Sequence, residues 1–212
     1  MIEYALILPG AYLLGSISWG LIIGKLKQGV DIRRHGSGST GTTNVLRLLG
    51  VRMAAIVLVA DISKGIIAVL AAKLVSNNLL LEALAALSVV AGHNWPVFSK
   101  FRGGRGITAA VGSLVMLAPI VAALALAAFV PIVSFSRYVS LASISAVIVA
   151  VAAMPIMVAL DLAPWQYLVY TTAGGPLIIW RHRGNIQRLI NGTENRLQFG
   201  GGPPGALPPH AR

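Results

Sequence analysis

The chain has 212 residues, of which 56% are hydrophobic and only 11% are charged, and its formal net charge is +11. A mean hydropathy of +0.79 and long apolar runs exclude a soluble domain of this size and predict an all-α, polytopic integral membrane helical bundle. The absence of cysteine excludes disulfides, thiolate nucleophiles and the usual zinc sites.

Four apolar regions predict the membrane-spanning helices. The first run, Tyr4 to Gly24, follows Glu3 rather than a basic segment, so it predicts a retained helix and not a signal peptide. The next two runs are Met53 to Val75 and Leu79 to about Val90. The last region, Ile107 to Trp180, is interrupted at Pro119, Pro131, Arg137, Pro155, Asp161 and Pro164. One membrane domain is expected over residues 1–197, followed by a disordered Gly/Pro-rich tail over 198–212.

A polar segment, Gly36 to Arg47, follows the first apolar run. Its glycines let backbone N–H groups face a ligand, and its hydroxyls add donors. Asn44 is expected to cap a helix that begins at Val45. The segment therefore predicts a phosphate site, with a flexible glycine loop between helices as the alternative.

The same segment matches two nucleotide-binding patterns. Gly36, Gly38 and Gly41 satisfy G-x-G-x-x-G, and the run also resembles a Walker A loop whose lysine position is Thr42. A dinucleotide fold needs a preceding buried strand, and a phosphate-binding loop needs its lysine. Because both are missing, these patterns do not indicate a nucleotide.

Two opposite charges lie inside the second apolar run. Asp61 and Lys64 are three residues apart, so they share a helix face and are expected to pair. Charges within a membrane helix are costly and seldom idle. We expect a lock between two helices, with a place in the polar site as the alternative.

The second polar segment, His93 to Gly106, carries one histidine, three cations and three glycines. Arginine forks suit phosphate oxygens, while Gly103 and Gly104 would let the backbone approach an anion. The alternative is a cationic anchor with Trp95 at the membrane interface.

The third polar segment, Arg181 to Glu194, joins His182 and Asn185 to several arginines and one acid. Taken alone, it is a basic helix that flanks a membrane span. Glu194 is expected to orient an arginine rather than to transfer a proton.

The distribution of cations predicts the topology. The three polar segments and their flanks hold 13 of the 17 basic residues, which by the positive-inside rule places all three on the cytoplasmic side. An even number of crossings must then separate them, which predicts seven transmembrane helices, with five as the alternative. The amino terminus is expected outside and the carboxy terminus inside. Nucleic-acid binding loses its support, since no aromatic residues interleave these cations.

The three segments form ordered motifs: Gly-Ser-Gly-x-x-Gly-x-Thr-Asn-x-x-Arg, then Gly-His-Asn-x-Pro-Val-Phe-x-x-Phe-Arg-Gly-Gly-Arg-Gly, then Arg-His-x-x-Asn-Ile-x-Arg-Leu-x-x-Gly-Thr-Glu. In order and spacing they resemble those of the acyl-phosphate-dependent glycerol-3-phosphate acyltransferases, the bacterial PlsY family. Gly15-Ser16 and the Ala60-Asp61-x-x-Lys64-Gly65 element agree as well. The resemblance covers roughly residues 5–197.

The resemblance implies transfer of a fatty acyl group from acyl phosphate to the 1-hydroxyl of glycerol 3-phosphate. The products would be lysophosphatidic acid and phosphate, in the first acylation step of phospholipid synthesis. The expected catalytic residues are His182, Asn185, Arg47 and Arg105. The expected substrate-binding residues are Ser37, Thr43, Asn44, His93, Gly103, Gly104, Arg188 and Glu194; the two glycines and Arg188 are included for their phosphate-binding chemistry.

The resemblance also bears on partners and location. Acyl phosphate, glycerol 3-phosphate and membrane lipid are the expected partners, with coupling to the enzyme that makes acyl phosphate as a further expectation. No cofactor, no metal and no nucleic acid are expected. The location implied is the bacterial inner membrane, with the active-site loops on the cytoplasmic side.

Three departures from the family pattern affect loop shape. Arg102 and Arg105 stand where lysines are usual, which keeps the charge but replaces a compact ammonium with a planar fork. Ser39-Thr40 replaces a frequent Asn-Pro, and Ser18 replaces a frequent proline. We expect phosphate binding to survive these changes.

An acyl phosphate is already activated, so the enzyme mainly has to position the hydroxyl and neutralise the charge that develops. We therefore expect substrate-assisted catalysis, in which a phosphate oxygen takes the hydroxyl proton, with a histidine base as the alternative. The first motif and Arg105 are expected to hold the acyl phosphate, and the third motif part of glycerol 3-phosphate. A metabolite transporter would need a midplane site and repeat symmetry, and the sequence shows neither.

Overall fold

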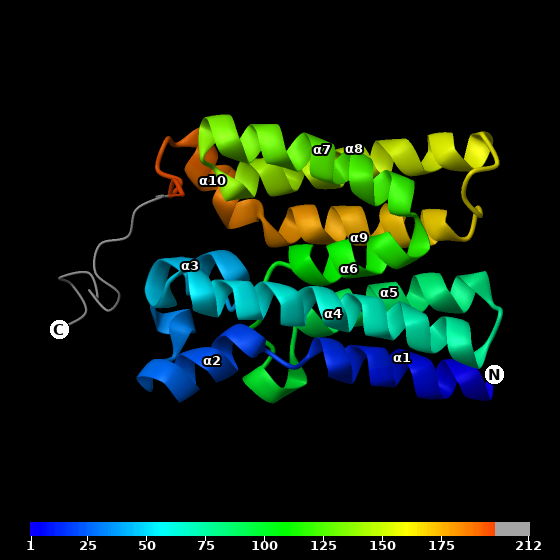
Figure 1. Ribbon diagram of the computed structural model, residues 1–212, viewed down its shortest axis with the longest axis horizontal. Coiled ribbons are helices and arrows are strands. Elements are labelled where there is room, and N and C mark those ends of the chain that lie inside the picture. The colour runs from blue at the N-terminus through cyan, green and yellow to red at the C-terminus, as the bar shows by residue number, and fades with distance from the viewer. Residues whose placement is uncertain (198–212) are drawn as a thin grey trace.

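The computed structural model describes residues 1–197, so the predicted disordered tail, 198–212, lies outside the described residues. The regular elements of the described part are helices, and most of them run along the long axis of the molecule (Figure 1), as the all-α prediction requires. In chain order they are α1 (Ile2–Gly15), α2 (Trp19–Gln28), η1 (Ile32–Arg34), α3 (Thr42–Leu49), α4 (Val51–Val75), α5 (Leu79–Asn94), η2 (Val97–Ser99), α6 (Ile107–Leu117), α7 (Pro119–Ser136), α8 (Val139–Ala159), α9 (Tyr167–Arg181) and α10 (Arg183–Ile190).

Four helical stretches are long and apolar enough to cross a membrane: α1 with α2, α4, α7 and α8. Helix α6 is apolar but shorter. The outward faces carry large apolar side chains, as on α7, where Ile120, Leu126 and Val130 are about half exposed or more. Such faces suit a lipid surrounding.

The long apolar region from Ile107 to Trp180 divides into the four helices α6 to α9. Pro119 begins α7, where its missing N–H is not needed. Arg137 and Asp161 occupy chain reversals with positive φ, at 61° and 56°. Pro131 and Pro155, by contrast, lie inside α7 and α8.

The prediction of one helix over Tyr4 to Gly24 is wrong, because the chain breaks between α1 and α2. The break leaves backbone carbonyls without helical partners. The Lys64 ammonium of α4 donates to two of them, the carbonyl oxygens of Gly15 at 3.0 Å and Ile17 at 3.3 Å. Its Nζ lies 2.9 Å from Asp61 Oδ1, and both side chains are 2% exposed. The predicted pair is therefore confirmed, and it joins α4 to the α1–α2 break as a lock between helices.

Glycines let neighbouring helices touch along their backbones. A Cβ on Gly65 of α4 would collide with the carbonyl oxygen of Ala109 in α6, and a Cβ on Gly112 of α6 would collide with that of Ile62. Small residues at such crossings are typical of membrane helix packing. Helix α6 is thereby held against α4 over its length.

A second polar network lies at the opposite end of the bundle and was not anticipated. The Tyr167 hydroxyl of α9 donates to Glu82 Oε2 of α5 at 2.6 Å. Lys73 Nζ of α4 lies 3.6 Å from the same oxygen and donates to the carbonyl of Met116, near the end of α6, at 2.8 Å. The network ties four helices together where α6 ends.

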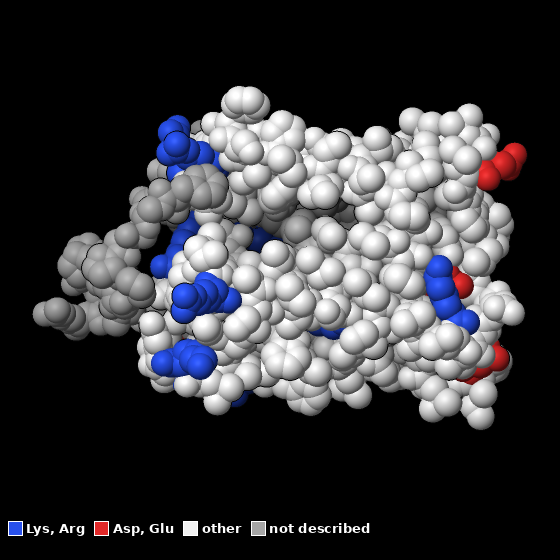
Figure 2. Space-filling model, in the orientation of Figure 1, with Lys and Arg blue, Asp and Glu red and all other residues white. Residues whose placement is uncertain are grey.

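Charge is distributed unevenly between the two ends of the molecule. Most of the Lys and Arg visible in Figure 2 gather at the end where α2, α3 and α10 lie, and the visible acidic side chains lie at the other end. The three polar segments of the sequence therefore share one end of the bundle.

Replacement of Lys64 by methionine should lower the free energy of unfolding in detergent by roughly 3 to 5 kcal/mol, because Asp61 is left buried without its partner. The double variant Asp61→Asn, Lys64→Met should lose less. Lys25→Met, at an exposed lysine, is the matched control. Equal stability of Lys64→Met and Lys25→Met in denaturant titrations would contradict the lock.

Candidate active site

Asn44 organises the first polar segment. Its Nδ2 donates to the carbonyls of Ile32, His35 and Ser39 at 2.9, 3.2 and 2.9 Å, and its Oδ1 accepts from the N–H of Ser37 at 2.9 Å. The predicted capping role is wrong, since Gly41 is the N-cap of α3 and Asn44 lies within the first turn. With its amide occupied by the loop, Asn44 sets the loop's shape.

The hydroxyls of this segment remain available. Ser37 and Thr43 are partly exposed, and neither side chain makes a hydrogen bond within the part of the chain that the structure describes. Gly36 and Gly38 have positive φ values of 58° and 69°, a conformation that glycine adopts without steric cost. The left-handed turns bring the loop close to α3, and two free hydroxyls remain there.

His93, Gly103 and Gly104 form the interior of the second segment. His93 is 5% exposed, and its carbonyl accepts the N–H of Gly104 at 3.0 Å. A Cβ on Gly104 would collide with the His93 imidazole, and a Cβ on Gly103 with the His93 carbonyl. The imidazole Nδ1 lies 3.7 Å from Asp61 Oδ1. The two glycines are therefore needed for the close packing that positions Arg105, the next residue.

Two arginines tie the second segment to its neighbours: Arg33 of η1, which directly precedes the first segment, and Arg181 of the third. Arg181 donates to the Gly104 carbonyl from Nε at 3.2 Å and from Nη2 at 2.8 Å. Arg33 donates from Nη1 to the Ser99 carbonyl at 2.8 Å, while its Nη2 pairs with Asp31 at 2.7 Å. These contacts bring the three segments together in space.

His182 lies at the junction of α9 and α10 and is 2% exposed. Its Nδ1 lies 2.9 Å from the carbonyl oxygen of Ile178. Since a carbonyl only accepts, Nδ1 carries the proton and Nε2 keeps a lone pair. The pKa of His182 is lowered to about 4, chiefly by burial; the hydrogen bond with the Ile178 carbonyl opposes this shift and nearby Arg105 adds to it. The imidazole is neutral at pH 7, with an acceptor nitrogen opposite the Ile178 contact.

Glu194 holds the third segment in place. Its Oε1 accepts from Asn185 Nδ2 at 2.8 Å and from Ser140 Oγ at 3.0 Å, and its Oε2 accepts from Arg188 Nε at 2.8 Å. Burial by itself would raise the pKa of Glu194, but the bonds from Asn185, Ser140 and Arg188 lower it below its ordinary value. Glu194 is therefore ionised and orients Arg188, which is the role expected from the sequence.

Ser140, near the start of α8, was missed by the sequence analysis. It lies in the long apolar region, 54 positions from Glu194, and one serine in such a region is common. No signal in the sequence distinguishes it.

Guanidinium groups from all three segments converge around Glu194. The pKa of Arg105 is lowered to about 10, chiefly by burial; Glu194 opposes this shift, whereas the charges of Arg188, Arg47 and Arg181 add to it. The pKa of Arg47 is also lowered, first by burial, with Glu194 and Arg188 as its charged neighbours. Arg47 reaches the third segment through a 3.3 Å bond to the Asn195 carbonyl. One carboxylate does not balance these cations, so the cluster favours an anion.

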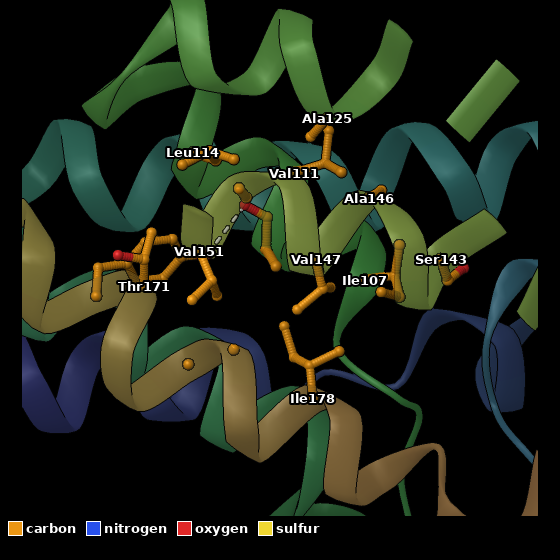
Figure 3. Close-up of a pocket in the computed structure, with 15 residues that line it drawn as sticks. Ile107, Val111, Leu114, Ala125, Ser143, Ala146, Val147, Val151, Thr171 and Ile178 are labelled. Atoms are coloured by element: carbon orange, nitrogen blue, oxygen red, sulfur yellow. Dashed lines mark hydrogen bonds between the residues drawn. The ribbon is translucent and has the colours of Figure 1, made fainter. Parts of the chain in front are cut away.

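An apolar groove begins beside the cations. Its volume is about 490 Å³ when the open space at its mouth is included, and its walls come from α6, α7, α8 and α9. Ile107 and Ile178 lie at one end, while Leu114 and Thr171 lie at the other (Figure 3). Ile107 follows Arg105 by two residues, and Ile178 bonds to His182. The arrangement suits a ligand with an anionic head and an alkyl chain.

Comparison with known proteins shows the family of the chain. A family model described as Glycerol-3-phosphate acyltransferase matches residues 5–192. The chain belongs to this family. The Glycerol-3-phosphate acyltransferase of Geobacter metallireducens is 51% identical over 198 residues, which cover 93% of this chain and 100% of that protein. That of Halalkalibacterium halodurans is 42% identical over 194 residues, with coverage of 91% and 94%.

Two crystal structures of PlsY, an integral membrane glycerol 3-phosphate acyltransferase, share this fold. The glycerol 3-phosphate form has a TM-score of 0.84 and 40% identity, and it covers 92% of this chain and 96% of that one. The lysophosphatidic acid form has a TM-score of 0.82 and 39% identity, with coverage of 92% and 95%. Together with the apolar helices, this likeness establishes an integral membrane protein.

His182 should make stability depend on pH. As the pH falls from about 6.5 to about 4, the unfolded chain takes up a proton at position 182 that the folded protein does not bind. The free energy of unfolding of the wild type should therefore fall by roughly 2 to 3 kcal/mol more than that of His182→Gln, which has no imidazole at this position. This contribution is measured by comparing the free energies of unfolding of the two proteins at about pH 7.5 and about pH 4.5. An equal difference at the two pH values would mean that His182 titrates normally in the folded protein.

Proposed function

We propose that this protein transfers a fatty acyl group from acyl phosphate to the 1-hydroxyl of glycerol 3-phosphate, forming lysophosphatidic acid and phosphate. The observation that carries the proposal is that the apolar groove ends at Ile107 and Ile178, near Arg105 in the chain and next to His182 through a hydrogen bond, beside the arginine cluster around Glu194. Both substrates have a phosphate, and one has an alkyl chain that the groove would accommodate. The ligands named for the two PlsY structures, glycerol 3-phosphate and lysophosphatidic acid, are an acceptor and a product of such a transfer.

Our proposed topology has seven crossings in the bacterial inner membrane. Helices α1, α4, α5, α6, α7, α8 and α9 follow one another in alternating directions (Figure 1). The amino-terminal end lies opposite the cationic end, which the positive-inside rule assigns to the cytoplasm. An odd number of crossings leaves α10 on the cytoplasmic side, together with all three polar segments.

We assign the binding residues from the side chains whose hydrogen-bond donors remain available to a ligand. Arg105, with the Ser37 and Thr43 hydroxyls, would hold the phosphate of the acyl donor. Arg47 and Arg188 border the same space and would share the charge of glycerol 3-phosphate with the third segment. Asn44, His93, Gly103 and Gly104 would act through the loops that they shape, since their polar groups are occupied or buried.

In the proposed reaction, the 1-hydroxyl oxygen of glycerol 3-phosphate attacks the carbonyl carbon of acyl phosphate. The new ester bond forms, the carbon–oxygen bond to phosphate breaks, and phosphate departs with the bonding electrons. The guanidinium groups neutralise the charge that develops on the leaving group, and their fixed positions make them effective. Asn185 is held by Glu194, and neutral His182 offers Nε2 to orient the attacking hydroxyl.

A phosphate oxygen of the substrate would receive the hydroxyl proton. A pKa of about 4 makes His182 a weak base at neutral pH, which favours this route over a histidine base. Loss of all turnover in His182→Gln, with folding and affinity for glycerol 3-phosphate intact, would instead support histidine as the base.

Replacement of Arg105 by glutamine should lower kcat/KM for acyl phosphate by roughly a hundredfold or more, because a positioned cation no longer meets the leaving phosphate. The exposed neighbour Arg102 is the matched control, and Arg102→Gln should change kcat/KM by less than about threefold. The assay follows labelled lysophosphatidic acid formed by purified protein in detergent. Equal losses in the two variants would contradict a specific role for Arg105.

A further inference from the structure

Helices α8 and α9 both line the apolar groove. Val147 and Val151 project from α8 (Figure 3). Helix α9 presents Thr171, Gly175 and Ile178, which are four and three residues apart and so lie on one face. Halfway along the groove, Gly175 therefore contributes only a hydrogen atom to the wall, whereas Thr171 and Ile178 on the same face contribute side chains.

Space for a larger residue at Gly175 is lacking. A Cβ there would overlap Val151 Cγ2 and lie 3.8 Å from Val147 Cγ1. Valine in a helix has one strongly preferred χ1 rotamer, so Val151 cannot easily turn away. The walls are also braced, because the Tyr170 hydroxyl of α9 donates to the Ala110 carbonyl of α6 at 3.0 Å, the dashed line in Figure 3.

Glycine in a helix interior is unfavourable relative to alanine. Position 175 lies within α9, eight residues after its start and six before its end. The missing methyl lets Val151 pack directly against α9, so an added methyl would displace a side chain that lines the groove. Gly175 lies seven residues before His182, about 10 Å along the helix axis, a depth that a long alkyl chain reaches and a short one does not.

We propose that Gly175 determines which acyl chain lengths the enzyme accepts, because an added methyl there would push the groove-lining Val151 side chain into the path of a long alkyl chain. This inference rests on the proposed function, in which the groove holds the alkyl chain of acyl phosphate. Gly175 acts on the chain alone, since it is remote from the arginines that hold the phosphates.

Gly174 offers a control on the same helix. Gly174 also lines the groove, but its Cβ would lie 3.3 Å from Leu87 Cδ2 of α5 and would have no α8 atom within 4 Å. Gly174→Ala makes the same chemical change one position earlier and tests whether any methyl in this turn of α9 is enough.

The experiment measures kcat/KM for saturated acyl phosphates from butanoyl to hexadecanoyl, with purified full-length protein in detergent. Gly175→Ala should lower kcat/KM for the long donors at least about tenfold relative to butanoyl phosphate, and KM for glycerol 3-phosphate should stay at the wild-type value. Gly174→Ala should change all donors by one common factor. The double variant Gly175→Ala, Val151→Ala, which removes the overlapping methyls, should restore the long donors.

Two results would overturn the inference. One is a uniform loss across all chain lengths in Gly175→Ala, and the other is a failure of Val151→Ala to rescue the long donors in a folded double variant. Failure of the proposed function looks different, because wild-type protein would then not use acyl phosphate of any length.

Discussion

Repulsion among guanidinium groups is the constraint on which the rest of this structure depends. Arg47, Arg105 and Arg188 converge from three separate segments, and the low pKa of Arg105 reflects their burial and mutual repulsion. The Glu194 carboxylate opposes that repulsion, and it is itself kept ionised by Asn185, Ser140 and Arg188. One carboxylate does not neutralise all of these arginines. The cluster therefore keeps an excess of positive charge, which a bound phosphate would stabilise.

The polar end is anchored to the membrane part of the bundle by contacts between distant positions. Lys64 satisfies the carbonyls at the α1–α2 break, and its partner Asp61 lies near the buried His93. Gly104 packs on that histidine, and the next residue is Arg105. Packed, buried groups therefore connect the break to the loop that carries Arg105. The same end opens onto the groove between α6 and α9, so that an anionic head and an alkyl chain can be held together.

Much of this arrangement could be predicted from residue types, but not the contacts that shape it. Arg47, Arg105, His182 and Glu194 were predicted because they lie in the polar segments that match the family motifs. The role of Asn44 was missed because its partners are backbone carbonyls and one N–H, which any sequence supplies. Ser140 and the helix break at Ser16 to Ser18 depend on Glu194 and Lys64, more than forty positions away. The apolar composition predicted the helices, but it could not predict the groove, because the groove depends on how those helices pack against one another.

The central claim is that the arginine cluster and the groove together use acyl phosphate as donor. The most direct measurement incubates purified wild-type protein in detergent with labelled glycerol 3-phosphate and either hexadecanoyl phosphate or hexadecanoyl coenzyme A. The account predicts labelled lysophosphatidic acid and one released phosphate per product from the acyl phosphate, and little product from the thioester. Folded protein that forms no lysophosphatidic acid from acyl phosphate, or that forms it only from the thioester, would contradict the account.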